Sequence, residues 1–161
     1  MSLKDKIVPS ESLADWRQRL RAEGRRLVVT NGCFDLLHAG HVIYLETARG
    51  FGDALLIGLN SDESVRELKG EGRPLNTASD RAIVLAGLES VTAVTVFPDT
   101  LAARFLSVAQ PDVYVKGGDY TLDTLNAEEK EIVESAGGRV ELVSFVPGKS
   151  TTRLIDTIHG R

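Results

Sequence analysis

Two histidines in the first quarter of the chain have a spacing that suits phosphate chemistry. His38 and His41 flank Gly40 in the run LLHAGHV, where a helix is expected to begin. Residues three apart in a helix share one face, so both imidazoles can act on one ligand. The unpaired N–H groups of a helix start attract anions, and a glycine allows a phosphate to come close. The pattern predicts a phosphate site, with two polar helix-cap residues as the alternative interpretation.

Three other kinds of site fit this loop less well. A zinc site needs a third ligand, and Cys33 with the histidines matches neither a zinc finger nor the His-Glu-x-x-His helix. A dinucleotide-binding turn needs three glycines in G-x-G-x-x-G and an acidic residue after the second strand. Asp62 meets the second requirement, but this loop has only Gly32 and then Gly40. Residues 148–150 have the end of a Walker loop without its first glycine.

Strand-like and helix-like segments alternate along the chain. Short apolar runs predict strands at residues 27–29, 54–59, 91–97, 112–115 and 140–145. Apolar residues at helical spacing predict helices at residues 10–23, 42–49, 79–88, 101–109, 127–136 and 151–159. The alternation implies right-handed crossovers and a doubly wound, parallel five-stranded sheet in a Rossmann-like α/β fold. Ligands of such sheets bind in the loops that follow the strands, here residues 30–40, 60–76, 116–126 and 146–152.

Length and composition fit one soluble domain over residues 1–161, with residues 1–26 as an N-terminal helical extension. The chain has 161 residues, of which 42% are hydrophobic and 26% charged. A net charge of −4 argues against a nucleic-acid partner, which would need a broad positive surface. The absence of a long apolar run and of a signal-peptide pattern, with a single cysteine, predicts a cytoplasmic protein without a membrane partner.

The runs TNGCFD and HAGH together resemble the signature of the nucleotidyltransferases with a HIGH-type motif, which include the cytidylyltransferases and small adenylyltransferases. The resemblance covers residues 27–158. Further segments are similar to one branch, the D-glycero-β-D-manno-heptose 1-phosphate adenylyltransferases: NSD at 60–62, LKG at 68–70, RPLN at 73–76, Arg81 with Leu85, KGGDY at 116–120 and STT at 150–152. Members of that branch are fused behind a sugar kinase or form a separate chain, and the length favours a separate chain.

The resemblance implies that ATP and heptose 1-phosphate react to ADP-heptose and pyrophosphate, with Mg²⁺ accompanying ATP. It implies catalytic roles for His38, His41 and Lys69. The implied nucleotide contacts are Thr30, Asn31, Gly32, Cys33, Phe34, Gly40, Arg73, Arg81, Gly118, Asp119, Tyr120, Ser150, Thr151 and Thr152. The implied sugar-phosphate contacts are Asp35, Asp62 and Lys69. No residue is assigned to the metal, which phosphate oxygens and water are expected to hold.

Some of these residues have structural alternatives. Arg81 can pair with Asp80 or Glu89 on its own helix, Ser150 or Thr151 can cap the last helix, and Cys33 can be a packing residue. The resemblance, together with the apolar character of residues 79–88 and 91–97, also implies a homodimer or a higher homo-oligomer.

Two other functions remain open. Glycerol 3-phosphate cytidylyltransferases resemble this chain, but they place an arginine and a glutamate before Ser-Thr-Thr, where this sequence has the run FVPGK at residues 145–149. A cytidylyltransferase or adenylyltransferase acting on another small phosphate is therefore the second hypothesis. A non-catalytic nucleotide-binding module is the third, and the presence of His38, His41 and Lys69 argues against it.

Overall fold

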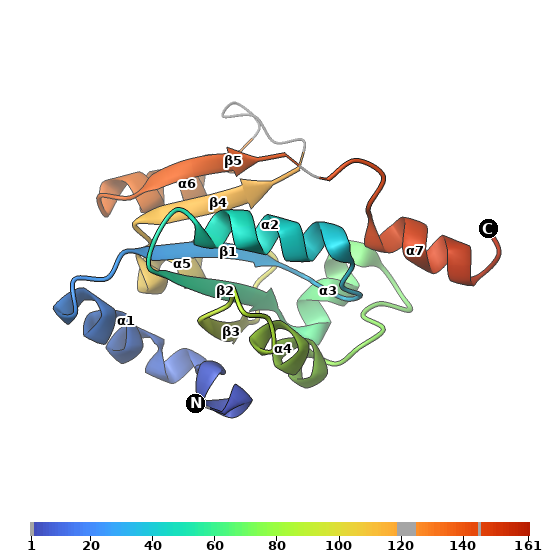
Figure 1. Ribbon diagram of the computed structural model, residues 1–161, viewed down its shortest axis with the longest axis horizontal. Helices are drawn as coiled ribbons and strands as arrows, with labels where there is room; N and C mark the ends of the chain where they lie inside the picture. The colour runs from blue at the N-terminus through green and yellow to red at the C-terminus, as the bar shows by residue number, and fades with distance from the viewer. Residues whose placement is uncertain (1, 119–124, 145) are drawn as a thin grey trace.

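The computed structural model describes residues 2–118, 125–144 and 146–161. Five strands form one sheet in the order β3-β2-β1-β4-β5, and every neighbouring pair is parallel (Figure 1). The strands are β1 (Leu27–Gly32), β2 (Ala54–Asn60), β3 (Ala93–Phe97), β4 (Val113–Gly117) and β5 (Arg139–Val143). The predicted doubly wound α/β sheet is confirmed, and its strand order reverses between β1 and β4.

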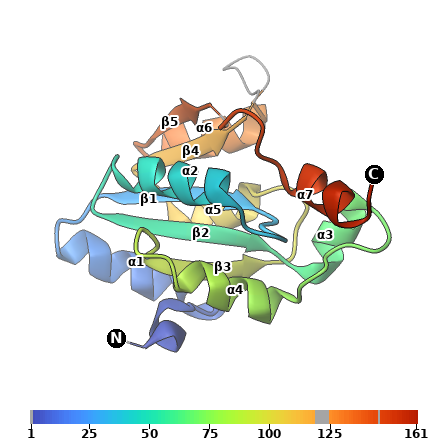
Figure 2. The same cartoon turned by 45° about the vertical axis from the view of Figure 1, so that its right-hand side comes forward.

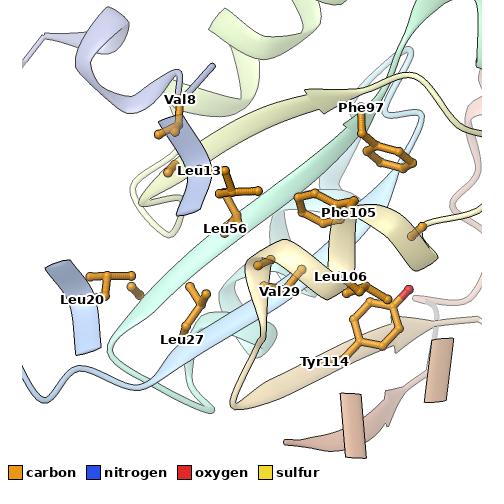
Figure 3. Packing of buried hydrophobic residues seen from close by; sticks show 14 of the residues in the cluster. Val8, Leu13, Leu20, Leu27, Val29, Leu56, Phe97, Phe105, Leu106 and Tyr114 are labelled. Atoms are coloured by element: carbon orange, nitrogen blue, oxygen red, sulfur yellow. The ribbon is translucent and has the colours of Figure 1, made fainter. Parts of the chain in front are cut away.

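Helices cover both faces of the sheet (Figures 1 and 2). One face packs against α2 (Ala39–Arg49) and α4 (Ala78–Ala86), and the other against α1 (Leu13–Ala22), α5 (Ala103–Ala109) and α6 (Ala127–Ser135). Successive residues of a strand point to opposite faces. Val28 therefore packs in a first core cluster, beneath α2 and α4, and Val29 in a second core cluster, beneath α1, α5 and α6. Figure 3 shows the second cluster, in which Phe105 and Tyr114 pack near Leu56 and Val29.

Two helical expectations need correction. The expected helix at 10–23 is divided into the 3-10 turn η2 (Ser10–Ser12) and α1, with a further 3-10 turn η1 (Leu3–Lys6) before them. The expected loop 60–76 contains a helix, α3 (Asp62–Lys69), whose N-terminus is capped by the Ser61 hydroxyl. Of its hydrophobic residues only Val65 is buried, so this short helix leaves too weak an apolar period to be predicted.

Main-chain pairing rather than apolar character sets where the strands end. β1 continues through polar residues to Gly32 because it pairs with β2 over its whole length, Gly32 lying opposite Leu59. β4 likewise extends to Gly117, opposite Val143, the last residue of β5. Residue 145, the end of the expected fifth strand, lies outside the described residues.

The sheet opens at its switch point. β1 pairs with β4 only where Val28 and Val29 face that strand, and the two strands separate beyond them. The Tyr44 hydroxyl from α2 spans the opening, 2.7 Å from Thr30 Oγ1 on β1 and 3.2 Å from the Val115 carbonyl oxygen on β4. The last helix, α7 (Thr151–Ile158), lies with α3 beyond this carboxyl end of the sheet (Figure 1). In the described part of the chain, no helix has the length and apolar character needed to cross a bilayer.

Candidate functional site

The two histidines meet at the first turn of α2, as their spacing predicts. His38 is the N-cap residue and His41 the third helical residue, and their rings stack with centroids 3.9 Å apart. The backbone N–H of His38 donates to Nδ1 of His41 over 3.2 Å. Because Nδ1 accepts this bond, neutral His41 carries its proton on Nε2 and presents a donor there.

The pKa values of both imidazoles are lowered, which favours their neutral forms. Burial, followed by the charge of His38, lowers the pKa of His41 to about 4. Burial and then the nearby Lys149 lower the pKa of His38. The Nδ1 atom of His38 is buried and has no hydrogen-bond partner among the residues that the structure describes. A buried polar atom without a partner is rare in folded proteins, and an ordered water or a bound ion commonly accounts for it.

Phe34 gives the loop before the histidines its sharp shape. Its φ of +46° lies in the left-handed region, which side chains rarely adopt. Its ring is buried and tilts against His41 with centroids 5.5 Å apart. Gly32 makes room for this ring, since a Cβ at Gly32 would lie 2.9 Å from Phe34 Cε2. The Phe34 side chain therefore supports the histidine turn from within the core.

Asp35 anchors a second loop to the histidine loop. Its buried carboxylate accepts hydrogen bonds from the backbone N–H groups of Leu75 and Asn76 and an ion pair from Arg73 at 2.7 Å. Burial opposes ionisation, but these donors outweigh it and lower the pKa of Asp35. The side chain of Asn76 returns a hydrogen bond to the Asp35 carbonyl oxygen. Asp35 and Arg73, expected to contact ligands, thus hold residues 73–76 against the loop after β1.

Arg81 joins four segments at the carboxyl end of the sheet. Its guanidinium, 1% exposed, donates to the carbonyl oxygens of Cys33, Asn60 and Asn76 and pairs with Asp62 at 2.7 Å. The expected partners on its own helix, Asp80 and Glu89, are not the ones it takes. These contacts give Arg81 an architectural role, and they also occupy one oxygen of Asp62.

Cys33 lies where several positive charges converge. Burial raises the pKa of its thiol, although Lys69, Arg81 and Arg73 act in the opposite direction. A raised pKa favours the protonated thiol, which agrees with the interpretation of Cys33 as a packing residue. Lys69 itself is exposed and ends α3, where Gly70 with a φ of +97° turns the chain.

A partly buried polar network lines the opening between β1 and β4. The Tyr114 hydroxyl lies 2.6 Å from Asn31 Oδ1 and 2.9 Å from Glu129 Oε1, and Lys116 Nζ lies 3.5 Å from the same Asn31 oxygen. Burial lowers the pKa of Lys116, and Glu129 opposes that shift. Thr30 faces the same opening through its contact with Tyr44. The network orients the Asn31 amide at the switch point, where ligands of such sheets bind.

The remaining predicted residues come from the later loops. Gly118 follows β4 with a φ of +99° and donates its N–H to the Val143 carbonyl oxygen, while Asp119 and Tyr120 lie outside the described residues. Ser150 caps α7 by accepting from the N–H of Arg153, as one interpretation predicts. Thr151 Oγ1 donates to the Leu36 carbonyl oxygen over 2.8 Å, and Thr152 is exposed. The N-terminus of α7 is thereby attached to the histidine loop.

Comparison with known proteins identifies the family. The family model described as cytidylyltransferase-like matches residues 29–156, from β1 into α7. The chain belongs to the cytidylyltransferase-like family. This confirms the nucleotidyltransferase superfamily that TNGCFD and HAGH indicate.

The chain is similar to proteins named bifunctional protein HldE. It is 54% identical to that of Geotalea uraniireducens over 95% of this chain and 31% of the relative. For Geobacter sulfurreducens the identity is 55% over 86% of this chain and 28% of the relative, and for Wolinella succinogenes 46% over 98% and 32%. The chain thus spans about a third of the length of these relatives.

One solved structure has the same fold at low identity. The lipopolysaccharide core biosynthesis protein of Thermoplasma volcanium superposes with a TM-score of 0.63 and is 23% identical, and the match covers 76% of this chain and 98% of that one. It supports the α/β fold described above.

Several residues at this end of the sheet were not predicted. Tyr44, Tyr114 and Glu129 belong to apolar or charged helix and strand patterns that carry no sign of a site. Lys149 does carry a sequence signal, because it directly precedes the Ser-Thr-Thr run at the start of a helix. A cation at that position can contact an anion bound at the helix N-terminus.

Proposed function

We propose that this chain transfers AMP from ATP to D-glycero-β-D-manno-heptose 1-phosphate, giving ADP-heptose and pyrophosphate. The observation that carries the reaction type is the stacked pair of neutral histidines at the start of α2, with an unpartnered ring nitrogen. The sugar is supported by the KGGDY and STT segments and by identities near 50% to the HldE proteins. The structural neighbour is a lipopolysaccharide core biosynthesis protein, and an activated heptose as product agrees with that role.

The chemistry needs positioning more than proton transfer. An oxygen of the heptose 1-phosphate attacks the α-phosphorus of ATP, and the bond from that phosphorus to the bridging oxygen breaks, releasing pyrophosphate. The attacking oxygen is already ionised at neutral pH, so no general base is required. Alignment and stabilisation of the growing negative charge then dominate the rate.

Three side chains supply that stabilisation in our proposal. His41 donates from Nε2, a direction fixed by the backbone bond at its Nδ1. His38 contributes the ring nitrogen that has no partner among the described residues. Lys69, the last residue of α3, would lie between the two negatively charged reactants and reduce their repulsion. The amides of the first turns of α2 and α7 add partial positive charge around the triphosphate.

We expect Mg²⁺ to enter with ATP. Among the described residues, no three His, Cys, Asp or Glu side chains gather as a metal site, and the donors around the histidines suit an anion. The proposed mode of binding is therefore through phosphate oxygens and water, and the ion would supply further neutralisation of the triphosphate.

Pyrophosphate release tests the proposal when it is measured across a grid of substrates. ATP and CTP are each combined with heptose 1-phosphate and with glycerol 3-phosphate, with Mg²⁺ present throughout. We expect turnover with ATP and heptose 1-phosphate well above the other three combinations. Turnover confined to CTP and glycerol 3-phosphate would replace our proposal by the second hypothesis. No turnover in any combination, with ATP still bound, would favour the non-catalytic module.

We further infer a homo-oligomer that acts in the cytoplasm without nucleic acid. Apolar side chains remain exposed on two neighbouring helices of one face, Val42 and Ile43 on α2 and Ile83 and Val84 on α4. Exposed apolar side chains on one face of the sheet support a contact between subunits. Sedimentation equilibrium of the wild-type chain tests the oligomer, and a mass equal to one chain at all concentrations would contradict it.

A further inference from the structure

Lys149 is held at a defined place by the turn before α7. The turn runs from Val146 to Lys149, whose N–H donates to the Val146 carbonyl oxygen over 3.3 Å. Pro147 occupies its second position, and Gly148, with a φ of +77°, occupies the third. This is the pattern of a type II turn, in which a glycine takes the left-handed position. Lys149 therefore leaves the turn immediately before Ser150, the cap of the helix.

The backbone and stem of Lys149 pack against the histidine turn. A Cβ placed on Gly40 would lie 2.9 Å from Cβ of Lys149 and 2.9 Å from Nδ1 of His38. Gly40 is thus a glycine that leaves room for both. The hydrogen bond from Thr151 to the Leu36 carbonyl oxygen fixes the same contact two residues further along. Residues more than one hundred positions apart in the chain are joined at this point.

The positive charges around the histidines fall into two groups. Arg73 and Arg81 are ion-paired with Asp35 and Asp62, and their guanidinium groups hold the loops together. Lys69 and Lys149 are exposed, and neither has a carboxylate within ion-pair distance in the described parts of the chain. Lys149 also acts on His38, whose pKa burial and this ammonium lower together. The charge of Lys149 therefore acts on the His38 ring, whose Nδ1 has no hydrogen-bond partner among the residues that the structure describes.

From this placement we infer that Lys149 is a further ligand-binding residue, which contacts the β- and γ-phosphates of the nucleotide and holds them as pyrophosphate departs. The inference rests on the proposed nucleotidyl transfer at His38 and His41. Lys69 and Lys149 would then serve different parts of the reaction, because Lys69 reaches the site from α3 and Lys149 from the turn before α7. The side chain adds a full charge to the partial charge of the α7 N-terminus.

The test compares four full-length proteins: wild type, Lys149→Gln, Lys149→Arg and the control Lys4→Gln. Lys4 is an exposed lysine in η1, at the N-terminal end of the chain. Calorimetric titration with inorganic pyrophosphate and Mg²⁺ measures binding without any sugar, and steady-state assays with ATP and heptose 1-phosphate measure KM and kcat. We expect Lys149→Gln to bind pyrophosphate about tenfold more weakly, as for loss of one charge-assisted contact. Its KM for ATP should rise with it.

Lys149→Arg keeps the charge and should retain most of the wild-type affinity, and Lys4→Gln should match wild type. Pyrophosphate binding by Lys149→Gln equal to that of wild type would overturn the inference, as would equal weakening in Lys149→Arg. The assignment of heptose 1-phosphate as substrate can be wrong while the role of Lys149 holds. If no protein converts heptose 1-phosphate but Lys149→Gln still loses pyrophosphate affinity, only the substrate assignment is wrong.

Discussion

His41 acts through an orientation that the backbone sets. The N–H of His38 occupies Nδ1, so the proton of the neutral ring is on Nε2. Burial and His38 keep the ring neutral down to a pH of about 4. A neutral donor in a fixed direction stabilises developing negative charge without the reorganisation that a mobile cation would need.

We therefore expect His41→Ala to lower kcat by on the order of 10²–10³, the usual cost of one such donor. Pyrophosphate release under saturating substrates measures it. His159, in the last turns of the chain and not assigned to the site, provides the control His159→Ala, which should leave kcat unchanged. A His41→Ala protein with wild-type turnover would contradict the role.

The lowered pKa of His41 also predicts a pH dependence of stability. In the unfolded chain the imidazole takes up a proton near its ordinary pKa of 6.5, whereas folded His41 does so only near 4. Between these values the unfolded state binds more protons, so the free energy of unfolding falls as pH is lowered from 6.5 to 4. Urea unfolding at a series of pH values should show a shallower fall in His41→Asn. Equal slopes for the two proteins would show that folding does not perturb this histidine.

Arg81 is predicted to act on stability and not on phosphate. Arg81→Met leaves Asp62 and the carbonyl oxygens of Cys33, Asn60 and Asn76 without their donor, at a cost of about 3 kcal/mol. The control Arg104→Met removes an exposed pair with Asp99 and should cost about 1 kcal/mol or less. Urea unfolding measures both. Wild-type stability combined with weak ATP binding in Arg81→Met would instead support the phosphate contact.

At the scale of elements, the loops after β1 and α3 form one unit through Asp35. The carboxylate accepts from two backbone N–H groups and from Arg73, so the position of the segment that follows Lys69 depends on one side chain. Such an arrangement explains why an acidic residue lies beside a site for anions. The neighbouring N–H groups and Arg73 compensate the negative charge of the Asp35 carboxylate.

We expect Asp35→Asn to speed hydrogen exchange at the amides of Leu75 and Asn76, because both donate to the carboxylate. Displacement of Lys69 with the loop should lower kcat by about 10²-fold, as a misplacement near 1 Å does. Asp99→Asn, at an exposed carboxylate, is the matched control. Unchanged exchange at Leu75 and Asn76 would refute the anchoring role of Asp35.

At the scale of the whole molecule, the two central strands of the sheet, β1 and β4, pair at Val28 and Val29 and are not paired toward their carboxyl ends. The Tyr44 hydroxyl replaces the missing main-chain pairing between β1 and β4 by contacting Thr30 and the Val115 carbonyl oxygen. Gly117 leaves space for its ring, since a Cβ there would lie 2.7 Å from Tyr44 Cε2. The carboxyl ends of β1 and β4 are thus held apart but in register.

Tyr44→Phe should lower the free energy of unfolding by about 1–2 kcal/mol, because the buried Thr30 hydroxyl loses its partner. Thr47→Ala, which removes an exposed hydroxyl from the same helix, should change it by about 0.5 kcal/mol or less. Chemical denaturation compares them. If both variants unfold like wild type, the opening between the strands does not depend on this bridge.

Local patterns in the sequence determined the sheet, most of its helices, the pairing of His38 with His41 and the family. Apolar runs and helical periods report burial along the chain, and the histidine spacing is a property of one helical turn. These local patterns did not predict the short helix α3, because it has a single buried hydrophobic side chain.

Only the tertiary structure decided which charged residues face a ligand and which hold the fold. Arg73, Arg81, Lys69 and Lys149 are equivalent cations in the sequence. Among the residues that the structure describes, the two arginines are paired with carboxylates distant in the chain and the two lysines have no such partner. The partners, Asp35 and Asp62, reach them through loops that the sheet brings together. Charge pairing depends on distances of a few ångströms in space, and spacing along a chain does not encode them.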